Sequence, residues 1–549
     1  MNVLERIGRW SQDGTRKLWF EYGGLALLIL LPLLSAGYIL TLDLVFTPSY
    51  AWPGEVTNTY PLQVLLWVLY HVLPGDVIEK LVLYGILLCA GVGMHLLLRV
   101  AMERVRVEAW DAAAYFAGIF YMINPFIYAR FMAGQWMVLL GYALVPFFVR
   151  AFLLLLHRPS WRAGAVVGIW AFIITTVSLH HVGIIGMLGF IMLTVSIAHY
   201  RKRRGEIIRR IKASLTTVAL WGILSSFWLF PTLVGNTSIS RAVEGFDSMH
   251  FNAFSTYGSN LLGALGNVLR LQGFWAETQQ LFLLPQQIVP AWGLIFALLW
   301  VLVGIGIRFA WRKSRVVASI GIASIIAGIV IAATPVVSWI GSLFPIVNGY
   351  REPHKFVNLI ALGYSLFGGF GVLYLRERYR LRDRMRMVVV GSALLVPIVI
   401  TPVMFGGFAG QLKPHEYPSG WHQANLYVKE RIGGSHALFL PWHQYARYSF
   451  SGRTIANPAA KYFAFPTIIS DDPEFKEVPP TLKNAETAHI QTLLANEPER
   501  LAQYLKKHDV RYVLLAKEQE YQRYQFLSSD TYTIRLTTDT ITVYEVKYE

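Results

Sequence analysis

Four ionisable residues stand together in VNGYREPHKF (347–356), a segment that separates two long apolar runs. They are Arg351, Glu352, His354 and Lys355. Ionisable groups beside hydrocarbon are unfavourable and tend to be retained for a function. Arginine presents a planar fork that matches phosphate oxygens, lysine a compact charge, and histidine a further donor. The segment therefore predicts a site for a phosphate or diphosphate, built from Arg351, His354 and Lys355. The alternative is a solvated loop in which Arg351 pairs with Glu352 and Lys355 snorkels.

A carboxylate that could act as a general base follows the first apolar run. Asp43 stands in GYILTLDLVFTP, directly after residues 22–42. Apolar surroundings raise the pKa of a carboxyl unless a cation or metal keeps it ionised, and such a carboxylate can accept the proton of a sugar hydroxyl. The alternative is that Asp43 only caps the next segment or ends the span. Glu55, later in the same loop, is a second catalytic candidate.

Polar residues of another segment are candidates for the wall of the same cavity. NPFIYARFMAGQW (124–136) breaks an apolar run at Asn124 and carries Arg130 and Gln135. Irregular backbone at membrane depth is tolerated where it lines a protein or water cavity. We therefore expect Asn124, Arg130 and Gln135, together with Glu352, to line this cavity.

Two histidines, His180 and His181, end a later apolar run on the same side. They could line the cavity and bond a substrate or ligate a metal, or they could be helix-end histidines bonded to carbonyl groups. The second interpretation is preferred because the sequence offers no clear third ligand. Cys89 is the single cysteine, which excludes a disulfide framework and a cysteine-ligated metal. No cofactor is predicted with certainty, and a divalent metal ion stays an open alternative.

The composition is that of a polytopic α-helical membrane protein. Of 549 residues, 54% are hydrophobic and 15% are charged, and apolar runs of about 20 residues recur. A further apolar segment at 59–74 is too short to span and is expected to lie in the membrane interface. Eleven spans are expected, at 22–42, 77–98, 111–131, 137–156, 163–180, 182–199, 214–234, 290–308, 316–336, 356–375 and 387–407.

The net charge of +16 maps largely to short loops between these spans. The most basic loops are 199–212, 308–315 and 376–386. Positively charged loops mark the cytoplasmic side, which places the N-terminus in the cytoplasm and the residues after about 410 outside. We therefore expect an integral protein of the plasma membrane that contacts membrane lipids, and no nucleic-acid partner.

Two domains are expected. Residues 1–410 form the transmembrane domain, with extracytoplasmic loops at 43–76 and 235–289, and residues 411–549 form a soluble extracytoplasmic α/β domain. The second domain contains no glycine-rich phosphate loop, no nucleophile elbow and no zinc-ligand spacing. Its expected elements are strands at 436–441 and 511–516, a helix at 497–510 and a hairpin at 531–546.

Several stretches taken together resemble a known family. They are GYILTLDLVFTP, FYMINPFIYARFMAGQW, GYREPHKF and, near the C-terminus, ALFLPW, RYVLLA and ITVYEV. This pattern is similar to the polytopic glycosyltransferases of the GT-C class, especially the arabinofuranosyltransferase-like and YfhO-like membrane proteins. The resemblance implies transfer of a sugar from a polyprenyl-phosphate-linked donor to a glycan, lipid or protein acceptor. It places Asp43 at the catalytic position, and the basic motif at 351–355 on the carrier phosphate. Many of these enzymes carry two adjacent acids, whereas Leu44 follows Asp43 here, which argues against a metal requirement.

Two alternative functions belong to other classes. A secondary transporter or flippase of lipid-linked glycan would need ionisable residues at mid-membrane and internal repeats with broken helices. A non-catalytic envelope scaffold would use the same fold to bind lipid-linked glycan, since a fold alone does not establish an activity.

Overall fold

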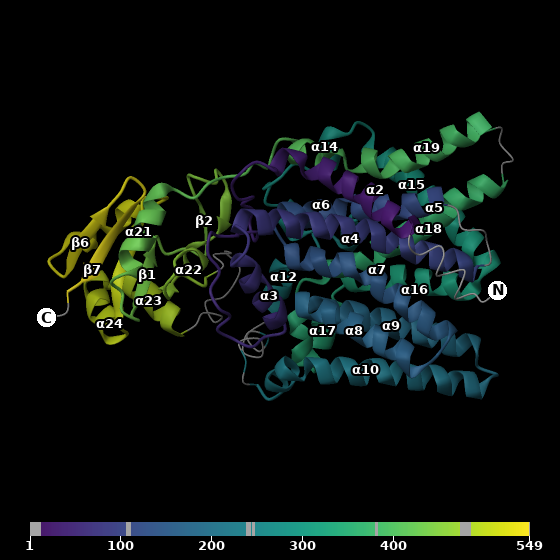
Figure 1. The fold of residues 1–549 in the computed structure, drawn as a ribbon, viewed down its shortest axis with the longest axis horizontal. Helices are drawn as coiled ribbons and strands as arrows, with labels where there is room; N and C mark the ends of the chain where they lie inside the picture. Colours follow the sequence, from purple (N-terminus) through teal and green to yellow (C-terminus); the bar gives the residue numbers. More distant parts are fainter. Residues whose placement is uncertain are drawn as a thin grey trace.

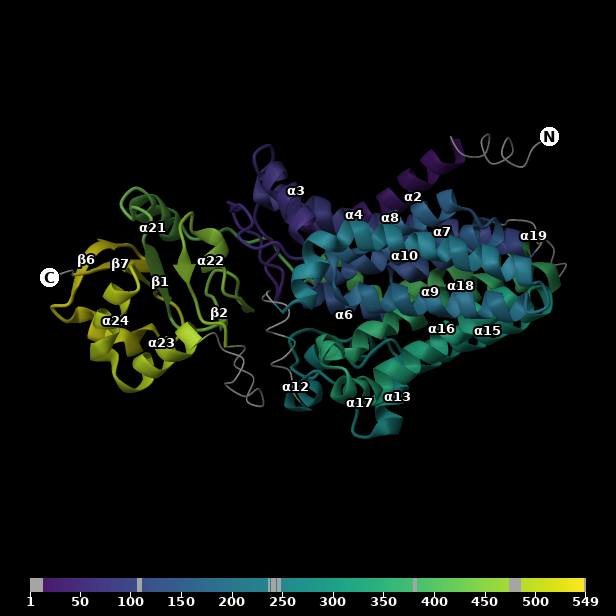
Figure 2. The ribbon, with the colours of Figure 1, turned by 90° about the horizontal axis from the view of Figure 1, so that it is seen from below.

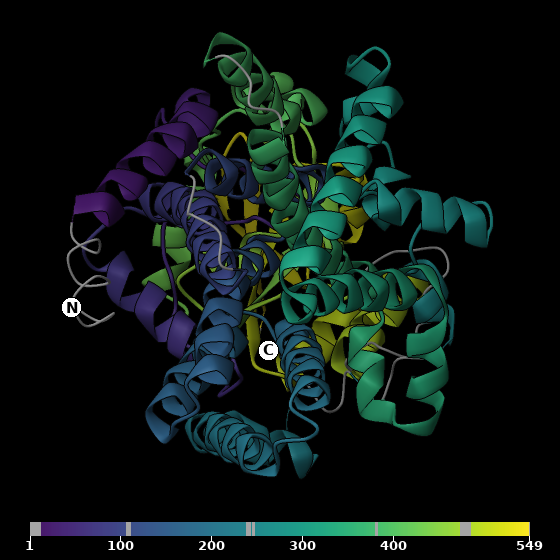
Figure 3. The same ribbon diagram turned by 90° about the vertical axis from the view of Figure 1, so that its right-hand side faces the viewer.

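A bundle of long helices forms one end of the molecule and a small sheet domain forms the other (Figure 1). Figure 3 looks along the bundle from the end that is remote from the sheet domain. The computed structural model describes residues 13–105, 111–235, 237, 243, 248–378, 383–472 and 485–547.

Eight segments in the described part of the chain are long and apolar enough to cross a membrane. Most are single helices: α4 (Gly75–Arg104), α7 (Trp136–His157), α9 (His180–His199), α10 (Arg204–Leu233), α15 (Trp292–Lys313) and α16 (Arg315–Ala333). The other two combine α5 (Asp111–Met122) with α6 (Pro125–Met132), and η4 (Pro353–Phe356) with α18 (Val357–Arg378). Shorter apolar helices are α3 (Tyr60–Tyr70), α8 (Trp161–Val177) and the later part of α19 (Asp383–Ile400). The chain is thus a helical integral membrane protein, while the total of eleven spans stays a prediction.

The predicted boundary of the first span is wrong. Instead of 22–42, the helix α2 covers Asp13–Leu30 and one 3₁₀ turn continues it to Leu33. Residues 34–42 are not helical because distant groups bind their backbone. The Ile39 amide donates to the Glu79 carboxylate at 2.8 Å, and Tyr38 pairs with His415. The loop that carries Asp43 therefore begins earlier than the sequence predicts.

The predicted span at 111–131 is interrupted. The chain leaves the helix at residues 123–124 and re-enters it at Pro125. Asn124 caps the new helix, because its side-chain oxygen accepts a hydrogen bond from the Ile127 amide at 3.2 Å. The break turns α6 into a short separate helix that ends near Gln135.

The helix α18 is the centre of the bundle, since the apolar window of its segment is 100% buried by the described residues. It lies against α15 at backbone contact distance. A Cβ atom at Gly306 would stand 1.8 Å from the Phe367 carbonyl oxygen, so glycine is required there. Because α18 directly follows η4, its burial fixes the basic motif at one end of the bundle.

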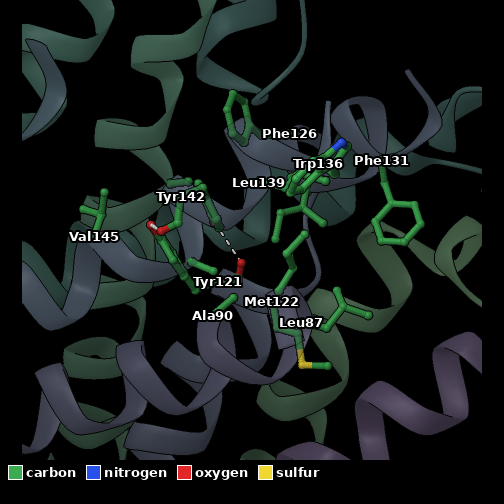
Figure 4. Packing of buried hydrophobic residues seen from close by; sticks show 14 of the residues in the cluster. Leu87, Ala90, Tyr121, Met122, Phe126, Phe131, Trp136, Leu139, Tyr142 and Val145 are labelled. Carbon is green, nitrogen blue, oxygen red and sulfur yellow. Dashed lines mark hydrogen bonds between the residues drawn. The ribbon is translucent and has the colours of Figure 1, made fainter. Parts of the chain in front are cut away.

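Aromatic side chains support the adjacent end of α5, α6 and α7 (Figure 4). The rings of Tyr121 and Tyr142 stack with their centroids 4.0 Å apart. The Tyr121 hydroxyl donates to the Tyr142 carbonyl at 2.9 Å and lies 3.1 Å from Asn358 Oδ1. Phe126 packs against the Tyr142 ring at 5.4 Å. This packing holds α6, and with it Arg130, against α18.

The C-terminal domain contains a five-stranded sheet of order β4-β1-β5-β7-β6. The strand β1 (His436–Leu440) runs parallel to β4 (Thr467–Ile468) and β5 (Val510–Ala516). The remaining strands, β7 (Ile541–Val546) and β6 (Tyr532–Thr537), are antiparallel. The predicted strands and hairpin are confirmed. The predicted helix at 497–510 is shorter, with η7 at Pro498–Arg500 and α24 at Leu501–Lys507.

The loop after α2 lies between the bundle and the sheet domain (Figure 2). A separate hairpin of the C-terminal part, β2 (Tyr445–Arg447) and β3 (Thr454–Ala456), contacts it. The Ala456 amide donates to the Leu42 carbonyl at 2.8 Å, and the Tyr417 hydroxyl donates to the Phe46 carbonyl at 2.8 Å. Both parts of the molecule therefore position the residues around Asp43.

The predicted loop 235–289 falls partly outside the described residues. Its described part contains four short helices: α12 (Ser248–Ala253), α13 (Leu261–Leu269), η2 (Trp275–Glu277) and α14 (Pro285–Ile288).

Candidate active site

Asp43 is held between the two parts of the molecule. Its amide donates to the Ala133 carbonyl at 2.9 Å, which anchors it to the end of α6. Gly134, with φ +73°, allows this approach, because a Cβ there would stand 2.2 Å from the Leu44 amide. On the other side the Tyr445 hydroxyl donates to Asp43 Oδ1 at 3.0 Å. The carboxylate thus faces both the bundle and the β2–β3 hairpin.

The surroundings of Asp43 act on its acidity in opposite directions. Burial raises the pKa of this carboxyl above its ordinary value. The hydrogen bond from Tyr445 opposes the rise, the negative charge of Glu352 adds to it, and Gln135 and Lys355 oppose it. A carboxyl with a raised pKa is a stronger proton acceptor once ionised, which suits a general base.

A chain of hydrogen bonds joins Asp43 to the basic motif. The Gln135 amide nitrogen lies 3.5 Å from Asp43 Oδ2, and its oxygen accepts from Arg130. The Arg130 guanidinium also donates to Glu352, which pairs with Lys355 at 2.7 Å. The fold thus brings together three segments that are separate in the sequence and that each carry predicted site residues: the loop at Asp43, the segment 124–136 and the motif at 351–355.

His354 belongs to this network. Its Nδ1 lies 2.8 Å from Arg130 Nη2, and its Nε2 lies 3.0 Å from the Gln272 carbonyl oxygen. Arginine is always a donor, so Nδ1 accepts, and Nε2 then carries the proton that it donates to the carbonyl. In this conformation His354 orients Arg130, whose guanidinium carbon also lies 3.8 Å from the Phe274 ring centroid.

Glu352 is the carboxylate that the cations hold ionised. Burial alone would raise its pKa, but Arg130 and Lys355 lower it well below the ordinary value. Its hydrogen-bonding partners are these two cations, so the internal Arg351–Glu352 pair is not the arrangement that the motif adopts. The Arg351 guanidinium lies 5.0 Å from the Phe254 ring centroid, and burial lowers its pKa.

The other predicted residues lie around this centre. Asn124 is buried and donates to the Tyr142 hydroxyl at 3.0 Å, so it supports α6. His181 is buried, with Nε2 3.4 Å from Asn358 Nδ2, whereas the His180 ring lies 6.2 Å from that of Tyr350. Glu55 is exposed in the loop that carries Asp43. Among the described residues, no group of three or more His, Cys, Asp or Glu side chains could hold a metal ion.

Two cavities lead from the side of the bundle toward the motif. One, of about 300 Å³, is lined by His180, Gly349 and Tyr350, so it ends one residue before Arg351. The other, of about 280 Å³, is an apolar groove between α7, α8, α9 and α10. Val182 and Trp221 line both. We call these two adjoining cavities the apolar path; its wall includes Tyr350, the residue that precedes Arg351.

Sequence analysis missed two groups at this centre. Tyr445 comes from a hairpin 402 positions after Asp43, and no local pattern marks it. Glu277 is partly buried in the loop 235–289, where its Oε2 accepts from the Gly273 amide at 3.0 Å. Desolvation raises the pKa of Glu277 to about 7, against the opposing effects of backbone hydrogen bonds from Gly273 and Phe274 and of the nearby Arg130 charge. A carboxyl within a loop of mixed composition gives no sequence signal.

Comparison with protein-family models gives no match, and comparison with curated proteins gives none. Solved structures do match. The arabinofuranosyltransferase AftD from mycobacteria matches 97% of this chain with a TM-score of 0.62 at 14% identity. The chain spans 40% of the length of AftD. ArnT from Cupriavidus metallidurans, solved with bound undecaprenyl phosphate, matches 97% of this chain and 98% of its own length, with a TM-score of 0.51 at 13% identity. The chain therefore has the fold of the GT-C-class membrane glycosyltransferases.

Proposed function

We propose that this protein is a membrane glycosyltransferase that takes a sugar from a polyprenyl-phosphate-linked donor and passes it to a glycan, lipid or protein acceptor. The observation that carries the proposal is the chain of contacts from Asp43 through Gln135 and Arg130 to Glu352 and Lys355. It sets a candidate base and a group of cations at one end of the bundle. The bound undecaprenyl phosphate of ArnT, a structure of similar fold, supports a polyprenyl carrier.

In this mechanism the acceptor hydroxyl attacks the anomeric carbon of the donor sugar. Asp43 takes the hydroxyl proton as the new carbon–oxygen bond forms. The bond between the anomeric carbon and the phosphate oxygen breaks, and the phosphate leaves with the bonding electron pair. Arg351 and Lys355 stabilise the charge that develops on this phosphate, while His354 assists by orienting Arg130. Glu352 keeps the cations in place without meeting the substrate.

The apolar path supplies a place for the isoprenoid tail. It opens among α7–α10 and ends at Tyr350, so a lipid lying in it would bring its phosphate to Arg351. We place this end of the bundle on the extracytoplasmic face of the plasma membrane, because the basic loops at 199–212 and 308–315 lie at the other end. Asn124, Arg130, Gln135, His180 and His181 then form the walls and supports of the site.

The test uses the full chain in proteoliposomes with a panel of polyprenyl-phosphate-linked sugars and a panel of glycan, lipid and peptide acceptors, and measures release of the polyprenyl phosphate. Wild-type protein releases the carrier from one donor, and Asp43→Asn lowers the rate by about a hundredfold or more, the range for loss of a general base. Glu55→Gln, in the same loop, tests the second catalytic candidate: it should leave release unchanged, and a loss equal to that of Asp43→Asn would move the general-base assignment to Glu55. Unchanged release by correctly folded Asp43→Asn protein overturns the general-base assignment. Carrier binding without release from any donor favours the scaffold, and flux of intact donor across sealed vesicles favours the transporter.

A further inference from the structure

A second charged cavity lies at the end of the bundle that is remote from Asp43. It has a volume of about 310 Å³ and is formed by the C-terminal turns of α15 and α18. Among the described residues that line it, four are cationic and a single one is a carboxylate, Glu377. The cations are Arg308, Arg312, Lys313 and Arg378. Phe309 and Tyr374 form aromatic parts of the wall.

The depth of this cavity follows from the length of α18. This helix has 22 residues, and at 1.5 Å per residue it is about 33 Å long, close to the thickness of about 30 Å of a hydrocarbon core. Its first residue follows the basic motif of the candidate active site, and its last residue, Arg378, lines the cavity. The cavity therefore lies at the level of the lipid headgroups on the opposite membrane surface.

The positive charges of the cavity are not balanced by its own carboxylate. Lys313 Nζ lies 3.9 Å from Glu377 Oε2, with each side chain 40% exposed. Such exposed pairs contribute little to stability. The Lys313 ammonium also lies 5.5 Å from the Phe309 ring centroid. The fold thus brings the basic end of α15 and Arg378 of α18, which are separate in the sequence, around one concave volume.

We propose that this cavity binds the phosphate-bearing headgroup of an acidic phospholipid. Guanidinium groups bind phosphate oxygens through paired donors, and arginines supplied by two helices surround an anion from more than one side. Basic pockets between membrane helices are suited to anionic headgroups. The apolar stems and the Phe309 and Tyr374 rings contact the lipid where its acyl chains begin. The exposed basic turn 201–204, by contrast, presents its charges from a single segment of the chain.

The test compares purified full-length protein with phosphatidylglycerol and with zwitterionic phosphatidylcholine, by native mass spectrometry and by the thermal unfolding midpoint. Phosphatidylglycerol binds more tightly and raises the midpoint. Arg308→Gln/Arg312→Gln weakens its binding by about thirtyfold, at roughly 1 kcal/mol for each cation. Arg378→Gln, on the other helix, weakens it by about fivefold. The matched control Arg201→Gln/Lys202→Gln changes binding by less than about twofold.

Several outcomes overturn the proposal. Equal binding of the two lipids removes the preference for acidic headgroups, and an equal loss in the control variant reduces it to general surface charge. Inorganic phosphate serves as the probe for a soluble ligand. If it alone gives the arginine-dependent rise in the midpoint and phosphatidylglycerol adds nothing, the ligand is a soluble phosphate and not a lipid. The cavity variants are judged in phosphatidylcholine first, where an unchanged midpoint shows that they fold normally.

Discussion

The Tyr445 hydroxyl donates a hydrogen bond to Asp43 Oδ1 at 3.0 Å, and so a residue of the C-terminal part reaches the candidate base of the membrane domain. The contact is supported by the backbone, since the Ala456 amide of the same hairpin donates to the Leu42 carbonyl at 2.8 Å. An acceptor hydroxyl must make the same kind of bond to Asp43 in order to lose its proton. The β2–β3 hairpin therefore lies where an acceptor has to approach.

The pH dependence of transfer follows from this bond. Asp43 acts as a base only when ionised, and Tyr445→Phe removes a hydrogen bond that favours the ionised form. Its pKa then rises further, and the acid limb of the kcat/KM profile moves to higher pH by about one unit, the effect of a hydrogen bond to a charged group. The profile from pH 4 to 9 checks this shift.

The control for this variant is Tyr504→Phe, in α24 of the sheet domain. It should leave the profile where it is in the wild type. A Tyr445→Phe profile that does not move, or moves to lower pH, would show that the bond does not tune Asp43.

Removing one partner of the buried Arg130–Glu352 pair should destabilise the protein strongly. The exposed fraction is 0% for the Arg130 side chain and 8% for that of Glu352. Glu352→Gln removes the carboxylate that Arg130 and Lys355 both bond and leaves two buried cations, which lowers the free energy of unfolding by about 3–5 kcal/mol. The thermal unfolding midpoint in a fixed detergent reports this loss.

A surface pair is the matched control. Arg500 and Glu497 approach to 2.5 Å, yet their side chains are 73% and 49% exposed. Glu497→Gln should therefore change the free energy of unfolding by less than about 1 kcal/mol. A similar small effect of Glu352→Gln would contradict the interpretation that Glu352 neutralises the buried cations.

Much of this site could be predicted because charge is rare in an apolar chain. Asp43 and the motif at 351–355 could be identified because they are charged residues next to long apolar runs. The apolar runs themselves predicted the positions of most helices to within a few residues. The end of the first helix was wrong because the backbone of residues 34–42 is bound by distant groups such as Glu79 and His415. Contacts with such distant residues produce no periodic pattern in the sequence from which the end of the helix could be predicted.

The sequence also does not show which charged residues pair with one another. The alternative interpretation of the motif paired Arg351 with Glu352, whereas Glu352 pairs with Lys355 and with Arg130, 222 positions earlier. Arg130 was predicted only as part of a cavity wall. Local spacing can identify a set of ionisable residues, whereas the assignment of partners depends on how α6 and α18 pack.

The apolar path can be tested by blocking its inner end. Gly183 lies on α9, where an added Cβ would stand 2.6 Å from the Tyr350 ring. Gly183→Leu should crowd this ring toward the cavity and weaken the binding of polyprenyl phosphate by about tenfold, which corresponds to about 1.4 kcal/mol of binding free energy. KM for the donor should rise more than kcat falls. Gly222→Ala, with no atoms within 4 Å of its Cβ, is the control and should bind normally.

Glu277 should make anion binding depend on pH near neutrality. Burial raises its pKa to about 7, so the side chain is largely neutral at pH 6 and largely ionised at pH 8. The ionised form adds a negative charge near Arg130, which offsets the attraction of the site for a phosphate. The affinity for a phosphodiester-linked donor should therefore fall a few-fold from pH 6 to pH 8 in the wild type. Glu277→Gln stays neutral throughout and should keep the affinity of the pH 6 state. Because a phosphodiester does not titrate in this range, the difference between the two proteins isolates Glu277, and parallel pH dependences in both would rule out its involvement.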